Sequence, residues 1–205
     1  MEEFWKMIYK FGRNANFLDT TSVVILDDSN IKEVCYLDYK KGWFKLAFKA
    51  GEMLELSLIP ELIFYYNSSV GGEFYETIIN AFGLLTIRSD VMEAFIENGV
   101  TGLQYIPIII EDKETGYRNT DYYIVNFLTQ LDAVNLEFSK FNYNAKYNMY
   151  SFWGNRICFN SHIIDGIDIF IDKKASMSVF VSEKIRQIFI KKKWHTMIFT
   201  ELNIV

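Results

Sequence analysis

The stretch Thr86-Ile87-Arg88-Ser89-Asp90 decides the fold, because its pattern returns near the C-terminus as Val179-Phe180-Val181-Ser182-Glu183. In each copy a β-favouring run is followed by a serine, an acidic residue and apolar residues at the spacing of an amphipathic helix. A second apolar run follows each helix. Serine is a common N-cap, and an acid in the first turn complements the helix dipole. The chain therefore predicts two pseudo-repeated strand–helix–strand units, with Ser89 and Ser182 as N-caps.

Most of the remaining chain also favours strands. Runs at 23–26 and 35–39, with alternating apolar and polar residues at 44–48 and 54–58, predict an antiparallel meander in the N-terminal third. The apolar run at 122–131 predicts a central strand or a pair of short strands. Three further segments complete the prediction: a short helix at 74–82, a strand at 167–172 and an exposed loop at 138–152. The expected fold class is α+β, with mostly antiparallel sheets.

The 205 residues are enough for one or two domains, and the charge is unevenly divided between two halves. Residues 1–121 contain 19 acidic and 11 basic side chains, whereas residues 122–205 contain 7 and 10. The charged segment 111–116 is typical of a hairpin turn and is the best candidate boundary. We expect a single domain over residues 1–205, with an N-terminal lobe at 1–121 and a C-terminal lobe at 122–205.

Composition excludes several classes of protein. Half of the residues are apolar and 17% are aromatic, which disfavours a disordered chain. An acidic N-terminal half disfavours nucleic-acid binding, which needs clustered lysine and arginine. The N-terminus opens with acidic residues and has no apolar core of a signal peptide, and the apolar runs are too short to cross a bilayer. We therefore expect a cytoplasmic protein without a membrane or nucleic-acid partner.

Candidate catalytic groups are few. His162, Asp165 and Asp168 have a spacing that metal ligands use on a helix, but the isoleucines around them favour a turn and a strand. Cys158 lies between apolar residues, which favours a buried thiol over a nucleophile paired with His162. No phosphate-binding loop, dinucleotide fingerprint or nucleophile elbow is present. We predict no catalytic, metal or cofactor site; an enzyme with a site near His162 and Asp165 remains the alternative.

Three motifs follow one another along residues 84–205. The first is Ile87-Arg88-Ser89-Asp90 with Glu97-Asn98-Gly99-Val100-Thr101-Gly102-Leu103-Gln104-Tyr105-Ile106-Pro107. The second is Tyr122-Tyr123-Ile124-Val125-Asn126-Phe127 with Leu131-Asp132-Ala133-Val134-Asn135 and Ser139, and the third is Val179-Phe180-Val181-Ser182-Glu183 with Ile198-Phe199-Thr200-Glu201. In order and spacing they resemble the signatures of the Imm11-like immunity protein family of bacterial polymorphic toxin systems. Asn135 and Phe170-Ile171 depart from the family's pattern.

The resemblance implies a protein that binds and neutralises a cognate toxin domain by occlusion, without catalysis. A non-catalytic accessory protein without a toxin partner is a further alternative. Three segments combine loop character with aromatic and charged residues, namely 65–75, 111–121 and 142–152. The first two lie in the acidic half, which suits a basic toxin face. The residues predicted to bind the partner are Tyr65, Tyr66, Glu73, Tyr75, Glu111, Asp112, Glu114 and Tyr117.

Overall fold

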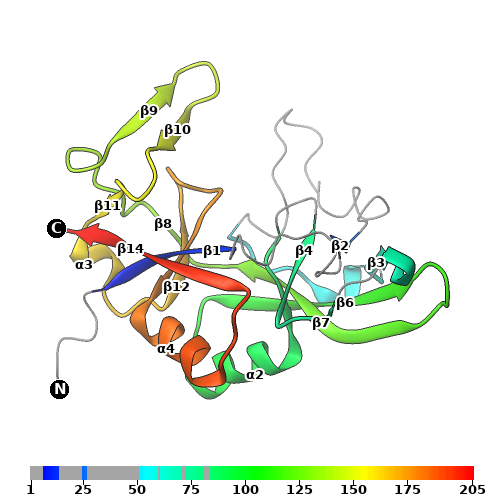
Figure 1. The fold of residues 1–205 in the computed structure, drawn as a ribbon. Coiled ribbons are helices and arrows are strands. Elements are labelled where there is room, and N and C mark those ends of the chain that lie inside the picture. Colours follow the sequence, from blue (N-terminus) through cyan, green and yellow to red (C-terminus); the bar gives the residue numbers. More distant parts are fainter. Residues whose placement is uncertain (1–6, 14–24, 27–50, 60, 71–72, 81–83) are drawn as a thin grey trace. The chain divides into compact units, whose positions relative to one another are not determined.

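The computed structural model describes residues 7–13, 25–26, 51–59, 61–70, 73–80 and 84–205 (Figure 1). Within these residues the chain forms two six-stranded sheets, a separate two-stranded hairpin and short helices, which confirms the α+β class. The sheets belong to two compact units. Unit 1 contains residues 1–13, 100–102 and 129–205, and unit 2 contains residues 14–99 and 103–128.

The sheet of unit 2 is mostly antiparallel. In the order in which they pair, its strands are β2 (Ile25–Leu26), β4 (Thr77–Asn80), β5 (Thr86–Arg88), β7 (Arg118–Phe127), β6 (Leu103–Asp112) and β3 (Ile63–Tyr66). The edge strands β2 and β3 run parallel to their neighbours, and the inner pairs are antiparallel. Helix α2 (Ser89–Glu97) joins β5 to β6 and buries Val91, Ala94 and Phe95.

Alternation along β6 builds the core of unit 2. Ile106, Ile108 and Ile110 are buried, whereas Pro107 between them is exposed. The three isoleucines pack with Phe64 and Tyr122 in one apolar cluster. A strand with a period of two thus supplies one face to the core and leaves the other to solvent.

The sheet of unit 1 has its own six strands. In pairing order they are β8 (Gln130–Leu131), β12 (Ile169–Asp172), β13 (Val179–Ser182), β1 (Ile8–Arg13), β14 (Met197–Ile204) and β11 (Cys158–Phe159). Here too the edge strands run parallel to their neighbours and the inner pairs are antiparallel. Helix α4 (Glu183–Lys192) joins β13 to β14, and the short helix α3 (Ser161–Ile164) lies between β11 and β12.

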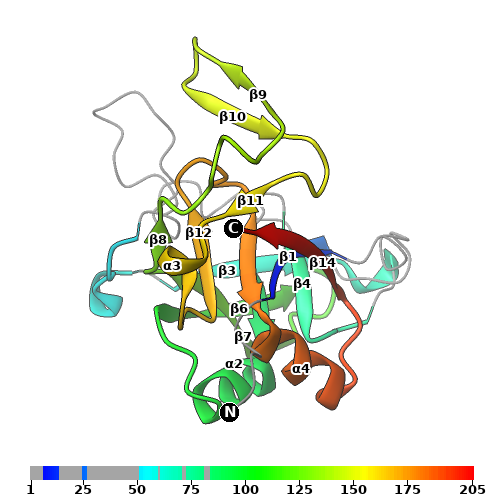
Figure 2. The same ribbon diagram turned by 90° about the vertical axis from the view of Figure 1, so that its left-hand side faces the viewer.

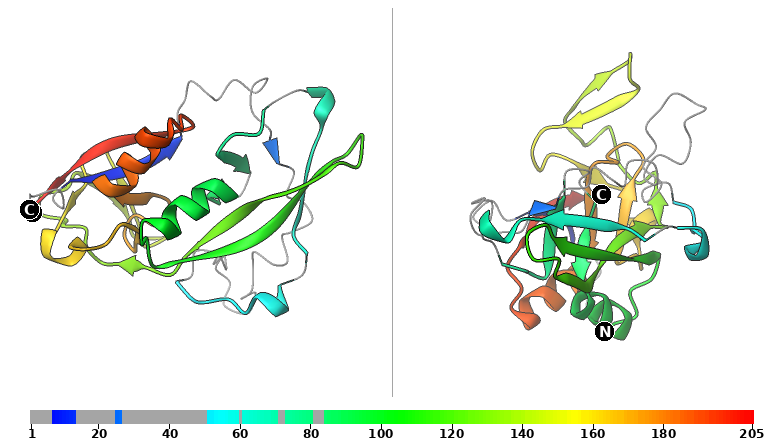
Figure 3. Two further views of the ribbon diagram at one scale, coloured as in Figure 1. Left: turned by 90° about the horizontal axis from the view of Figure 1, so that it is seen from below. Right: turned by 90° about the vertical axis from the view of Figure 1, so that its right-hand side faces the viewer.

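The two sheets have the same pattern of strand directions, and their strand orders match except for the place of one central strand in the chain. In each, a helix joins two parallel strands that are separated by one antiparallel strand. In unit 2 this central strand is β7, which follows β6 in the chain; in unit 1 it is β1, from the opposite end of the chain. Figure 3 shows β1, in blue, beside β14, in red. Superposition of the two units stays a prediction.

Aromatic residues fill both faces of the unit 1 sheet. On one face Phe159 packs on Phe170 and Phe180, with ring centroids 5.6 and 4.8 Å away. On the other, the ring of Phe11 lies 5.3 Å from that of Phe189 in α4. Because β1 is a central strand, it buries side chains on both faces of the sheet.

The starts of the two helices differ from the prediction. Ser182 occupies the N-cap position of α4, but its hydroxyl donates to Asp168 Oδ1 at 2.9 Å and makes no capping bond. Ser89 is the first residue of α2, and Arg88 occupies the N-cap position. The Asp90 carboxylate accepts two hydrogen bonds from the Arg88 guanidinium, at 2.9 and 2.7 Å. The predicted N-cap position is confirmed for Ser182 and wrong for Ser89, and neither serine side chain makes a capping hydrogen bond.

Other segments also differ from expectation. The strand expected at 54–58 is wrong, since residues Leu56–Leu58 form a short 3-10 helix, η5. The backbone N–H of Leu54 donates to Gln104 Oε1 (2.9 Å) and its carbonyl accepts from Gln104 Nε2 (2.6 Å), so these groups are not available to a strand partner. The helix expected at 74–82 is wrong as well, since its β-branched residues form strand β4. The expected runs at 35–39 and 44–48 lie outside the described residues.

The strands expected at 122–131 and 167–172 are confirmed by β7, β8 and β12. The segment 111–116 turns the chain from β6 into β7, inside unit 2. The compact units thus have other boundaries than the expected lobes, and the single domain stays a prediction. In the described part of the chain, every helix is too short or too polar to cross a membrane.

Candidate partner-binding surfaces

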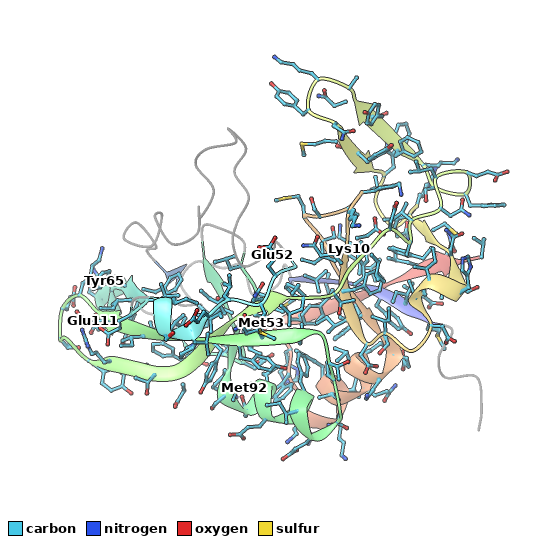
Figure 4. All side chains as sticks on the ribbon, turned by 180° about the vertical axis from the view of Figure 1, so that it is seen from behind. Lys10, Glu52, Met53, Tyr65, Met92 and Glu111 are labelled. Carbon is cyan, nitrogen blue, oxygen red and sulfur yellow. The ribbon has the colours of Figure 1, made fainter. Side chains whose placement is uncertain are left out.

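Six of the eight residues predicted to bind a partner meet at one end of the unit 2 sheet. Tyr65 lies opposite Glu111 and Tyr66 opposite Asp112 in the parallel β3–β6 pair (Figure 4). Glu114 and Tyr117 follow in the β6–β7 turn. The remaining two, Glu73 and Tyr75, flank Phe74, whose ring packs on Tyr66 at 5.1 Å. We call these eight residues the acidic end.

Asp112 organises this end from within. Its carboxylate accepts hydrogen bonds from the Ser68 backbone N–H (3.1 Å) and hydroxyl (2.7 Å), from the Glu114 N–H (3.2 Å) and from the Thr115 hydroxyl (2.6 Å). The Thr115 bond is the main reason why the pKa of Asp112 is well below its ordinary value. The residue is only 2% exposed. Asp112 therefore fixes the turn and the short 3-10 helix η6 (Ser68–Val70) and offers little to a partner.

Basic side chains reduce the negative charge of the acidic end. Arg118 Nε binds Glu111 Oε2 at 2.6 Å, and its Nη1 lies 3.7 Å from Glu61 Oε2. Lys113 Nζ lies 5.6 Å from the centre of the Tyr65 ring. Exposed negative charge therefore comes mainly from Glu73 and Glu114, and the most exposed aromatic residue here is Tyr117, at 59%.

Tyr66 and Tyr75 both interact with other residues of unit 2. Burial, with the nearby Asp112 charge, raises the pKa of Tyr66. A hydrogen bond to Glu73 raises the pKa of Tyr75, and the Tyr75 carbonyl accepts a bond from the Tyr122 hydroxyl at 2.5 Å. Both rings are half-buried, so they shape the acidic end more than they project from it.

A second surface lies in unit 1, where an exposed loop was expected. Strands β9 (Phe141–Asn144) and β10 (Met149–Phe152) form a regular hairpin whose strands pair only with each other among the described residues. In Figures 1 and 2 it stands away from the unit 1 sheet. Tyr150 packs against Phe141 (5.3 Å) and Tyr143 (4.8 Å), so the hairpin is held by its own aromatic rings. The segment is exposed, as predicted, but its pairing is regular and not that of the irregularly paired loop that was expected.

A groove of about 530 Å³ opens beside this hairpin, between β10 and the turn that follows β12. Lys10 of β1, which is labelled in Figure 4, is one of the residues that line this groove. The lining residues that matter here are Lys10, Asp132, Met149, Lys173, Lys174 and Met177. The groove thus combines cations with flexible apolar side chains.

Asp172 holds the wall of the groove, a role that sequence reasoning missed. Its buried carboxylate accepts backbone hydrogen bonds from Ala133 (2.7 Å), Val134 (3.1 Å) and Lys174 (2.8 Å). Burial raises the pKa of Asp172, and these bonds and the Lys173 charge oppose that rise. The one signal in the sequence was an aspartate at the end of a strand, followed by two lysines.

The candidate enzyme site does not come together as a reactive cluster. His162 and Asp165 are exposed around α3, whereas the Asp168 carboxylate is buried and bound by the Ser182 hydroxyl (2.9 Å) and Lys184 Nζ (2.8 Å). Burial raises the pKa of Cys158, which favours the unreactive thiol. Among the described residues there is no group of three or more side chains placed to hold a metal ion.

Comparison with known proteins identifies the family. The sequence model described as "Immunity protein family (Imm11)" matches residues 27–203 of the 205. This match covers the three motifs, the acidic end and the second surface. A search of curated proteins found no match. The chain belongs to the Imm11 family of immunity proteins.

Proposed function

We propose that the protein binds and neutralises a cognate toxin domain of a bacterial polymorphic toxin system, in the cytoplasm, by occluding it. The family match over residues 27–203 is the observation that carries this proposal. Occlusion requires a slowly dissociating interface, which comes from desolvated anchors inside a polar rim.

We propose further that the chain contributes no catalysis. Among the polar groups that could have formed a reactive site, His162 and Asp165 are exposed, whereas Asp168 is buried and held by Ser182 and Lys184. Such a buried, satisfied cluster supports a structural role, because a catalytic group must reach its substrate.

The acidic end is the surface proposed to attract a basic face of the toxin. Of its eight residues, we assign direct contact to Tyr65, Glu73, Glu114 and Tyr117. Asp112, Glu111, Tyr66 and Tyr75 support them through the contacts described above. Exposed charges at a rim change the association rate more than the final affinity.

The test is co-expression of this chain with the C-terminal domain of a secreted protein encoded next to it. The expected result is survival of cells that the domain alone kills, and a complex of the two purified proteins. Cell death despite normal amounts of folded immunity protein would contradict the proposed function.

The enzyme alternative has its own test in the same assay. His162→Ala with Asp165→Asn is expected to protect fully, because both side chains are exposed and neither is one of the proposed contacts. Loss of protection by this folded variant, with toxin binding retained, would favour the enzyme instead.

A further inference from the structure

We propose that the β9–β10 hairpin and the groove beside it form the anchor surface for the toxin, and that the occupant is an acidic toxin segment with an apolar side chain. The proposal rests on the proposed function and names the second surface and its ligand chemistry. Three independent observations support it: the exposure of the hairpin, the charge of the groove and the kind of apolar residue at its mouth.

The hairpin exposes more apolar surface than its own stability needs. An isolated two-stranded hairpin is marginal in water, so apolar residues on it should face a core. Here Tyr143, Tyr147, Met149 and Trp153 are each about half exposed. Several large exposed apolar residues on one short element favour an interaction site, and tyrosine and tryptophan are frequent interface anchors.

The charge of the groove selects an acidic occupant. Lys174 forms an ion pair with Asp132 across the groove. Lys10 and Lys173 have no acidic partner within 4 Å in the part of the chain that the structure describes. Lys10 therefore faces the groove without an acidic partner among the described residues, and Lys173 interacts with the buried Asp172 carboxylate only. A carboxylate of the toxin in the groove would attract both cations.

The apolar residues at the mouth suit a side chain from another protein. Met177 is 78% exposed and Met149 51% exposed, and both line the groove. Methionine is unbranched and polarisable, so it adapts to the shape of an incoming group. The volume of about 530 Å³ is typical of sites that enclose a ligand group. An aromatic or aliphatic toxin side chain fits this lining, flanked by the carboxylate that Lys10 and Lys173 bind.

The experiment measures binding of the purified toxin domain, the same domain as in the co-expression test. Met149→Ala with Met177→Ala is expected to raise Kd at least tenfold, mainly through faster dissociation. Lys173→Glu is expected to slow association and to reduce its dependence on salt. Matched controls are Met53→Ala, at an exposed methionine of unit 2, and Lys192→Glu, on the exposed side of α4; both should bind as the wild type does.

Removing most of the hairpin tests the surface even if each single substitution changes toxin binding only slightly. Replacing residues 142–151 by Asn-Gly keeps the Phe141–Phe152 pair and removes the rest of the hairpin. The variant should unfold within a few degrees of the wild type, because the hairpin lies outside both sheets, and it should lose most toxin binding. Wild-type affinity in all three groove and hairpin variants would overturn this inference while leaving the proposed function standing. Failure of the wild-type protein itself to bind the toxin domain would overturn both.

Discussion

At the scale of the residue, the path from α2 to β6 depends on two glycines. Gly99 and Gly102 have φ angles of +66° and +78°, a region in which other residues are strained. A Cβ on Gly99 would meet open space, whereas a Cβ on Gly102 would collide with the Thr129 hydroxyl. Both glycines belong to the first family motif, so this part of the motif encodes a backbone shape.

Replacing the two glycines separates these effects. Gly99→Ala should cost about 1–2 kcal/mol through its φ angle alone. Gly102→Ala should cost more, because the Thr129 side chain must move as well. Urea unfolding measures both, and adding Thr129→Ala to Gly102→Ala should recover part of the difference. Equal stability of the two single variants would show that Thr129 does not restrict this site.

Tyr105 gives the stability a dependence on alkaline pH. Its hydroxyl is buried without a hydrogen-bond partner among the described residues, and burial raises its pKa from 10.0 to about 12. Between these values the unfolded chain releases the proton and the folded chain keeps it. The contribution of Tyr105 is therefore complete below pH 10 and decreases as the pH rises toward 12.

Tyr105→Phe removes both the buried hydroxyl and its titration. At pH 7 the variant should be as stable as the wild type or more stable by about 1 kcal/mol. Above pH 10 its melting temperature should fall less steeply. Tyr147→Phe, at an exposed ring, is the control and should follow the wild-type profile. Parallel profiles for Tyr105→Phe and the wild type would contradict this role.

At the scale of the element, the β6–β7 hairpin depends on Asp112 as much as on its own ladder. This carboxylate joins the turn to η6, a segment 44 residues earlier in the chain. Asp112→Asn places an amide where four donors converge, so the turn and η6 should loosen. The lowered pKa gives the same contribution a pH limit. It is complete above the ordinary carboxyl pKa and is lost as the pH falls through the folded value.

Hydrogen exchange measures this loosening. The amides of Ser68 and Glu114 should exchange faster in Asp112→Asn, while those of the inner strands stay protected. Glu114→Gln, at an exposed neighbour, should leave both rates unchanged. For the same reason, reversing the charges of Glu111, Asp112 and Glu114 together would confuse binding with folding, and Glu114→Lys is the cleaner probe of the acidic end.

The comparison of sequence with structure is most instructive for these elements. The strand–helix–strand segments were predictable, because their periods change from two to 3.6 at a serine and an acid. Strand β4 was not, since 74–82 mixes aromatic, acidic and β-branched residues without a clear period. The β9–β10 hairpin was not predicted, because the composition of its segment, with its exposed aromatic residues, is typical of a loop. Asp112 and Asp172 each combine bonds to neighbouring residues with bonds to residues about 40 positions away, and no local pattern reveals the distant ones.

At the scale of the whole molecule, the two sheets differ in the origin of one central strand, which in unit 1 is β1, at residues 8–13. Ile8 of β1 lies opposite both Ser182 and Leu202. In unit 2 the corresponding strand, β7, simply follows β6 through a short turn. Joining the chain ends would give unit 1 the same connection that unit 2 already has.

A circular permutant tests this equivalence. It begins at Asn14, joins Val205 to Met7 through a short glycine-rich linker and ends at Arg13. It should fold and unfold cooperatively within a few degrees of the wild type, because Ile8 lies beside Leu202 near the end of β14. A permutant opened between Phe180 and Val181, inside β13, should fail to fold. Failure of the first permutant with a range of linker lengths would show that the N-terminal connection itself is needed.

The pairing of β1 with β13 and β14 also sets the order of events during synthesis. Residues 8–13 leave the ribosome before unit 2, but their hydrogen-bonding partners in β13 and β14 are made only after it. Unit 2, encoded between them, has all its strands available earlier and can fold while translation continues. A nascent chain therefore carries β1 without its strand partners until β13 is made, and a product terminated before β13 cannot complete the sheet of unit 1.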